Sequence, residues 1–262
     1  MRVARLVLSF ILIASSPLEL SSQQTSVVPQ RDPQAIAILQ QSFARMGGPT
    51  LGSIQDTRTT VQAWTSQDTT APPFSATIIT QGNSHLRVDS QSPHGTISFA
   101  INGTSAASLE PGQPVEVQPR ASFGTTTITH LPIFTLQSQL NNISATVKYV
   151  GLEQDEASTV HHIRIQQPLN PAAGLGNLDV PIEFFINSQT LLPAKLIYGI
   201  RAPSNLATVS LVQAQYTDYR PVAGILAPFT VRYSTDGGFL NEQHVITLNV
   251  NVGATDANFE LR

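Results

Sequence analysis

The chain contains no cysteine, which excludes disulfide bonds, thiolate chemistry and a lipid-modified N-terminal cysteine. The absence of a free thiol is compatible with an oxidising compartment, where an unpaired thiol would be a liability. Charged residues are also scarce, at 12% of the chain, against about 25% in ordinary soluble proteins. The 14 lysines and arginines are scattered singly and the formal net charge is -3, so we expect no nucleic-acid partner.

Long hydrophobic runs are absent too. The apolar run Leu6–Ala14 follows Arg2 and Arg5 and precedes a pair of serines, which is the order of a secretory signal. It is too short to be a membrane anchor, because spanning a bilayer requires roughly 20 residues. We therefore predict a signal peptide over residues 1–22, a flexible leader over 23–31 and one mature domain over 32–262. The mature chain is expected to have no transmembrane segment and to be periplasmic or secreted.

A helix is predicted over residues 33–46. Asp32 can accept the first free N–H groups as N-cap, and Pro33 suits the first helical position. Gly47 and Gly48 permit the left-handed turn that ends a helix. A weaker pattern favours a second helix over 130–141. Steps of three and four residues give the first helix one apolar stripe of Ile36, Leu39, Phe43 and Met46.

Most of the remaining chain alternates polar and apolar residues, as half-buried strands do. Turn residues such as Asn102-Gly103 separate strands at roughly ten-residue spacing, which indicates an antiparallel meander. Residues 111–124 and 168–179 are predicted to be connections. Strands are expected at Thr57–Trp64, Phe74–Thr80, Leu86–Asp89, Ile97–Ile101, Ala106–Leu109, Ala145–Leu152, Val160–Gln166, Ile182–Ile186, Leu191–Tyr198, Val209–Tyr219, Ile225–Tyr233 and His244–Val252.

So many half-buried strands cannot stay flat, because sheets twist and curl. We therefore predict a mainly β fold with few helices. In it, a strongly curved antiparallel sheet forms an incomplete barrel, and the helices cover its concave face. That arrangement buries the apolar side of every strand and the apolar stripe of the first helix.

Four segments of the chain form a set: Met46-Gly47-Gly48, Ile186–Lys195, Tyr216–Phe229 and Asn249-Val250-Asn251 with Phe259. In kind and order they resemble the LolA/LolB-like group of periplasmic lipoprotein carriers and related exported proteins. The resemblance covers about 32–262 and is most specific in the C-terminal third, although Asn187 stands where the group usually has Asp. It implies an incomplete antiparallel barrel closed by helices around an apolar hollow, and we transfer no functional residue from it.

Signatures of catalysis and of metal or cofactor binding are missing. The chain has no Gly-x-Ser-x-Gly elbow, and Gly174-Leu175-Gly176 is not followed by the lysine of a phosphate-binding loop. His161 and His162 are adjacent on a predicted strand, so their rings should point to opposite faces. We therefore predict no catalytic residue, no metal site and no cofactor.

The apolar hollow is the remaining candidate for a function. We expect a non-enzymatic envelope protein that binds an apolar ligand, such as a lipid or the acyl chain of a lipoprotein. The alternative is a structural or protein-interaction module with a filled core and no ligand. An enzyme would require converging titratable groups with shifted pKa values. The side chains predicted to line the hollow are Trp64, Phe74, Ile78, Ile97, Phe99, Ile182 and Phe184.

Overall fold

The computed structural model describes residues 29–65, 72–82, 84–92, 94–119, 129–155, 158–167, 180–202, 204–236 and 238–262. The predicted signal peptide, most of the predicted leader and the predicted loop 168–179 lie outside these residues. The strands are β1 (Asp56–Trp64), β2 (Phe74–Gln81), β3 (His85–Ser92), β4 (Gly95–Asn102), β5 (Ser105–Leu109), β6 (Glu116–Gln118), β7 (Thr146–Asp155), β8 (Ser158–Gln166), β9 (Ile182–Asn187), β10 (Pro193–Ala202), β11 (Asn205–Val222), β12 (Ile225–Thr235) and β13 (Gly238–Val250).

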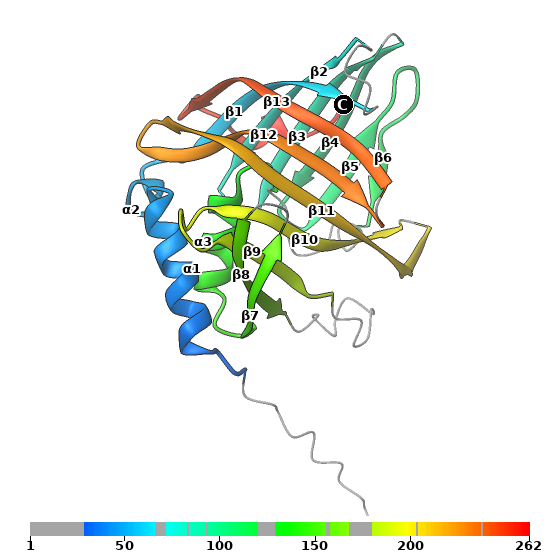
Figure 1. Cartoon of the computed structure of the whole chain (residues 1–262). Helices are drawn as coiled ribbons and strands as arrows, with labels where there is room; N and C mark the ends of the chain where they lie inside the picture. Colours follow the sequence, from blue (N-terminus) through cyan, green and yellow to red (C-terminus); the bar gives the residue numbers. More distant parts are fainter. Residues whose placement is uncertain are drawn as a thin grey trace, which may run out of the picture.

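These strands form one antiparallel sheet of 13 strands in the order β6-β5-β4-β3-β2-β1-β13-β12-β11-β10-β9-β8-β7. Among the strands that the structure describes, β1 and β13 are the only neighbours in the sheet that are not consecutive in the chain. The edge strands β6 and β7 do not pair with each other in the described part of the chain, so the sheet does not close into a barrel (Figure 1). The predicted curved, incomplete antiparallel barrel is confirmed.

Both predicted helices are present, as α1 (Pro33–Arg45) and α3 (Pro132–Asn141). The Asp32 carboxylate accepts the N–H of Gln34 at 2.8 Å, which confirms the predicted N-cap. Its other oxygen accepts the N–H of Tyr149 at 3.3 Å and so ties the start of α1 to edge strand β7. Arg31 donates to the carbonyls of Gln139, Leu140 and Asn142 at the end of α3.

The end of α1 is joined to the turn between β11 and β12. Gly47 has a φ of 88°, which only glycine adopts readily, and the short helix α2 (Gly48–Leu51) follows it. The N–H of Leu226 donates to the Met46 carbonyl at 2.9 Å. A Cβ at position 47 would lie 2.2 Å from the Gly224 carbonyl oxygen. This close approach fixes where α1 sits on the sheet.

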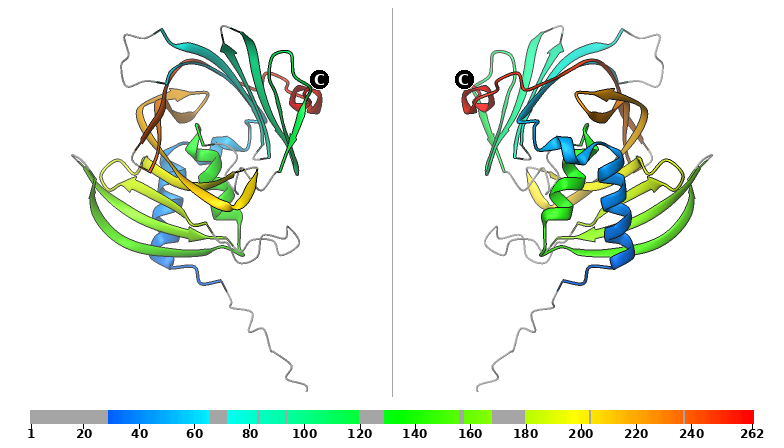
Figure 2. Two further views of the ribbon diagram at one scale, coloured as in Figure 1. Left: turned by 90° about the vertical axis from the view of Figure 1, so that its right-hand side faces the viewer. Right: turned by 90° about the vertical axis from the view of Figure 1, so that its left-hand side faces the viewer.

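Figure 2 shows α3 inside the curve of the sheet, with α1 alongside it. We call this side of the sheet the inner face. Ile38, Leu39, Ile133 and Leu136 of the two helices pack with inner-face side chains of β7–β12, such as Phe184. The helices therefore lie on the concave face, as predicted, but they cover only one half of it and fill that half with a continuous core.

Several strand boundaries differ from the expectations, among them the end of β10, which extends to Ala202 instead of Tyr198. Strand β6 lies within the predicted connection 111–124, β11 is longer at both ends than predicted, and β13 begins at Gly238 instead of His244. Each of the additions at β6, β11 and β13 contains Gln, Glu or Asn, or contains proline. The alternation of polar and apolar residues does not predict these additions, because they are strands by virtue of backbone hydrogen bonds to a neighbouring strand.

The C-terminal segment covers part of the outer face through η3 (Asp256–Phe259). Phe259 is buried against this face, with its ring 5.2 Å from the ring of His85. The buried Asp56 carboxylate accepts the N–H groups of Val252, Gly253 and Ala254 at 2.6, 3.2 and 3.1 Å. The last strand is thereby held to the first one.

Candidate functional site

The strands β1–β4 carry an apolar surface on the inner face, beyond the helix-covered core. Cross-strand pairing aligns Ile78 with Val88 and Val88 with Phe99, so one apolar row crosses three strands. Phe74, Leu86 and Val88 are only partly buried and pack around the buried Val61, Ala76 and Ile78. Ile97 lies on the same face and is 42% exposed. We call the inner-face side chains of β1–β4 the apolar wall.

No side chain of the apolar wall is charged. The inner-face positions of β1–β4, in the register that the structure gives, hold only Thr, Val, Ala, Phe, Ile, Leu, Ser and Gly. Arg58, Arg87 and Asp89 belong to the same strands but alternate onto the outer face. Arg87 and Asp89 pair there at 2.9 Å. The wall therefore suits uncharged groups, since burying a charge without a partner is costly.

The residues predicted to line the hollow fall into three places. Phe74, Ile78, Ile97 and Phe99 lie together on the apolar wall. The list also contains side chains of the helix-covered core and one side chain of the outer face. Their role in binding stays a prediction.

Ile182 and Phe184 are the two covered members of that list. They are 2% and 0% exposed within the core that α1 and α3 fill. Trp64 follows the buried inner-face residues Val61 and Ala63, so strand alternation puts it on the outer face. There its ring lies 4.8 Å from that of His244.

Three buried tyrosines mark the boundary between the covered half and the wall. The Tyr216 hydroxyl donates to the Thr129 carbonyl at 2.7 Å, and the Tyr233 hydroxyl lies 3.4 Å from the Thr129 hydroxyl. Burial raises the pKa of Tyr198 to about 12 and raises the pKa values of Tyr216 and Tyr233 as well. All three therefore stay protonated at neutral pH. Local sequence patterns do not predict this cluster, because its members come from three different strands, β10, β11 and β12.

His130 lies next to Thr129 and is buried. Burial lowers its pKa from 6.5 to about 4, so the ring is neutral at physiological pH. Its Nε2 atom has no hydrogen-bond partner. Asn241 Oδ1 and Gln243 Oε1 are also buried without a partner. The middle of the inner face therefore contains polar atoms that the protein does not satisfy.

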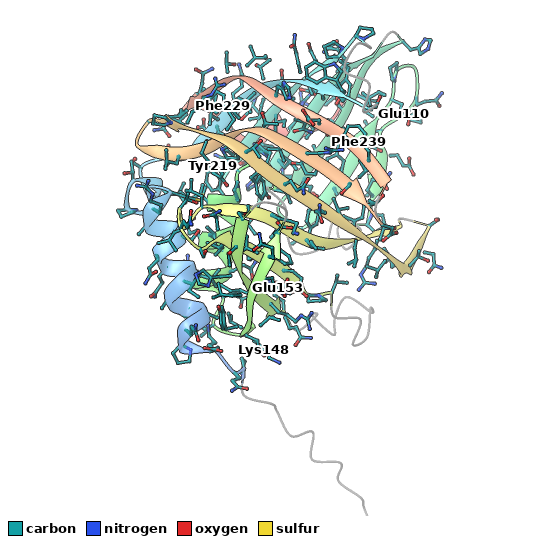
Figure 3. All side chains as sticks on the ribbon, in the orientation of Figure 1. Glu110, Lys148, Glu153, Tyr219, Phe229 and Phe239 are labelled. Atoms are coloured by element: carbon teal, nitrogen blue, oxygen red, sulfur yellow. The ribbon has the colours of Figure 1, made fainter. Side chains whose placement is uncertain are left out.

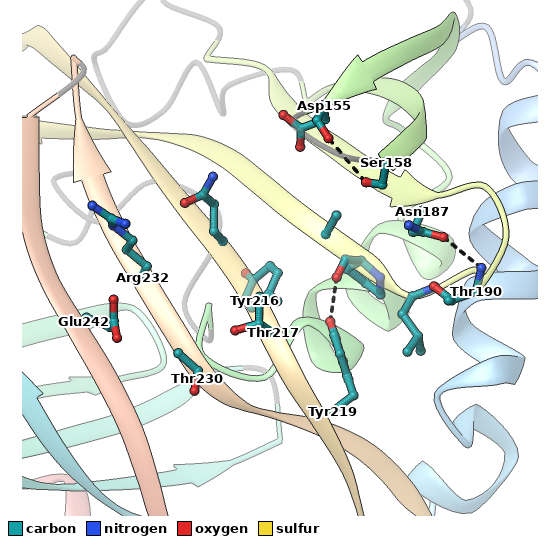
Figure 4. A pocket seen from close by; sticks show the side chains of 14 residues that line it. Asp155, Ser158, Asn187, Thr190, Tyr216, Thr217, Tyr219, Thr230, Arg232 and Glu242 are labelled. Atoms are coloured by element: carbon teal, nitrogen blue, oxygen red, sulfur yellow. Dashed lines mark hydrogen bonds between the residues drawn. The ribbon is translucent and has the colours of Figure 1, made fainter.

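The outer face carries a groove of about 630 Å³. It lies where the β9–β10 turn separates from β11, and the Tyr219 hydroxyl bridges the two by donating to the Pro193 carbonyl at 2.8 Å (Figure 4). Most of the residues that line it are polar. The full set of lining residues is Asp155, Ser158, Asn187, Thr190, Leu192, Pro193, Ala194, Gln215, Tyr216, Thr217, Tyr219, Thr230, Arg232 and Glu242. None of the predicted lining residues is among them.

His161 and His162 point to opposite faces, as predicted. His161 Nδ1 lies 3.1 Å from the Tyr149 hydroxyl. His162 lies between Glu153 and Glu183, at 2.6 and 2.8 Å, on the outer face (Glu153 is labelled in Figure 3). Among the residues that the structure describes, no three His, Asp or Glu side chains are placed to hold a metal ion.

No helix in the described ranges is both long enough and apolar enough to cross a bilayer. No protein-family model matches the chain. No curated protein sequence matches it either.

Solved structures do match. A LolA superfamily protein from Nitrosomonas europaea is 10% identical, with a TM-score of 0.54, over 85% of this chain and 97% of that one. A DUF1329 family protein from Desulfovibrio piger is 12% identical, with a TM-score of 0.56, over 86% and 97%. A domain from Vibrio parahaemolyticus, named for outer membrane lipoprotein sorting, is 12% identical, with a TM-score of 0.54, over 86% and 96%. At these identities the match concerns the fold, and the chain has the fold of the LolA-like group.

Proposed function

We propose that the protein is a non-catalytic binding protein of the cell envelope whose ligand is apolar, such as a lipid or the acyl chain of a lipoprotein. The observation that carries the proposal is the apolar wall. It is uncharged, partly exposed, and lies on the inner face of a sheet whose other half is already filled by α1 and α3. The LolA-like fold supports this proposal only as an analogy, since one fold hosts many activities.

The energetics allow useful affinity without any charged anchor. Burying one CH₂ group contributes about 0.8 kcal/mol. An acyl chain that buries roughly ten methylenes would therefore gain about 8 kcal/mol before the cost of ordering the chain is subtracted. We place the chain along Phe74, Ile78, Ile97 and Phe99, which share the wall.

A second candidate function is a protein-interaction module with a filled core. The observation that favours it is the groove on the outer face, which is polar and lies away from the apolar wall. In that case the wall would contribute only to stability.

Uptake of an apolar fluorescent probe by the purified protein separates the two. We expect saturable uptake, competition by a lipid, and roughly five- to tenfold weaker binding in Ile97→Gln, because a polar amide replaces a wall side chain. The control is Leu152→Gln, which removes another exposed aliphatic side chain, 59% exposed on β7. An intact protein that takes up no probe, or equal loss in both variants, would contradict the proposal.

A further inference from the structure

Two amide side chains of β13 carry buried oxygen atoms without hydrogen-bond partners, Asn241 Oδ1 and Gln243 Oε1. The register places Gln243 opposite Ala63 of β1 and Val231 of β12. It places Asn241 opposite Tyr233. Both amides therefore lie on the inner face, between the apolar wall on one side and the tyrosine cluster on the other.

These atoms are unusual because the large majority of buried polar atoms in proteins have a partner. The neighbouring hydroxyls do not supply one. The Tyr216 hydroxyl donates to the Thr129 carbonyl, and the Tyr233 hydroxyl faces the Thr129 hydroxyl. A buried acceptor that has lost water and gained no donor destabilises the folded state. A ligand that brings donors to this place removes that penalty as it binds.

We propose that the ligand is neutral and carries hydroxyl or amide N–H donors in its head group, which pair with Asn241 Oδ1 and Gln243 Oε1 while its apolar chain follows the wall. This inference rests on the proposed function and adds the class of head group. A carboxylate or phosphate head group carries hydrogen-bond acceptors, so it could not donate to the two amide oxygens. The adjoining wall of β1–β4 also offers no cation to neutralise such a group.

Two lipids with the same acyl chain isolate the head group. Monooleoylglycerol carries two hydroxyl donors, and methyl oleate carries none. In a competition assay against an apolar fluorescent probe, we expect monooleoylglycerol to bind roughly tenfold more tightly, since it satisfies acceptors that methyl oleate leaves unpaired. Oleate at neutral pH, which is anionic, is expected to bind more weakly than monooleoylglycerol.

Variants of the two amides test the assignment to these atoms. Gln243→Met and Asn241→Leu keep the approximate size of each side chain and remove its acceptor. We expect the preference for monooleoylglycerol to disappear in the double variant, while the affinity for methyl oleate is retained. The control is Gln62→Met, because Gln62 lies exposed on the neighbouring strand and points to the outer face. Cooperative thermal unfolding of each variant shows that it is folded.

The outcomes separate this inference from the proposed function. If both lipids bind equally well, or if the preference survives in the folded double variant, the head-group inference is overturned and apolar binding stands. If neither lipid displaces the probe, or the probe does not bind, both proposals are wrong. If the double variant does not fold, the single variants carry the test, and each must lose part of the preference.

Discussion

Replacing Gly47 by alanine tests the contact between the end of α1 and the β11–β12 turn, which holds α1 on the sheet. A φ of 88° costs a residue with a Cβ about 1–2 kcal/mol. The new Cβ would also lie 2.2 Å from the Gly224 carbonyl oxygen, so the corner has to move away from the β11–β12 turn. That movement strains the hydrogen bond from the Leu226 N–H to the Met46 carbonyl. Such a hydrogen bond contributes about 1 kcal/mol to the free energy of unfolding. Together these effects predict a loss of about 3 kcal/mol in the free energy of unfolding.

Urea denaturation of the wild type and two glycine variants measures this loss. The matched control is Gly52→Ala, because Gly52 has a φ of -61° and no atom within 4 Å of the position of a Cβ. Alanine is compatible with that backbone and should change stability by less than about 1 kcal/mol, in the stabilising direction. Equal effects of the two substitutions would refute the account of how α1 is docked.

Two further substitutions probe buried polar groups. The pKa of His130 is lowered from 6.5 to about 4, so the unfolded chain binds a proton that the folded chain does not, and stability falls as the pH drops through this window. Between about pH 7 and pH 4 the wild type should lose roughly 3 kcal/mol more than His130→Gln in denaturation experiments, and parallel pH curves would contradict this. Asp56→Ala removes the acceptor of three backbone N–H groups and should cost roughly 3 kcal/mol or more. The exposed Asp256→Ala serves as control, and a similar small change in both would disprove the role of Asp56.

Features of this fold that depend on a few neighbouring residues can be predicted from the sequence. Asp32 and Pro33 mark the start of α1, and Gly47 marks its end, because capping and positive φ depend on one or two residues. The alternation of polar and apolar residues identifies most strands, because it also depends only on residues that are close in sequence. The curvature and the helices on the inner face could be expected because ten or more half-buried strands and an apolar helix stripe must bury one another.

The site was less predictable because it depends on pairing between distant segments. Trp64 was predicted to line the hollow, but alternation along β1 puts it on the face opposite to Val61 and Ala63. Ile182 and Phe184 are inward, yet only tertiary packing shows that helices cover them. The unpaired oxygens of β13 leave no trace in sequence, because Gln and Asn occur equally well on exposed strand faces.

Photo-crosslinking with a fatty alcohol that carries a diazirine at the end of its chain tests the central claim directly. After irradiation and proteolysis, mass spectrometry locates the modified peptides. We expect labelling of β2, β3 and β4 at wall positions such as Phe74, Ile97 and Phe99, and loss of labelling in excess unlabelled lipid. Labelling confined to the outer groove around Tyr219 and Arg232, or label that excess lipid does not displace, would contradict it.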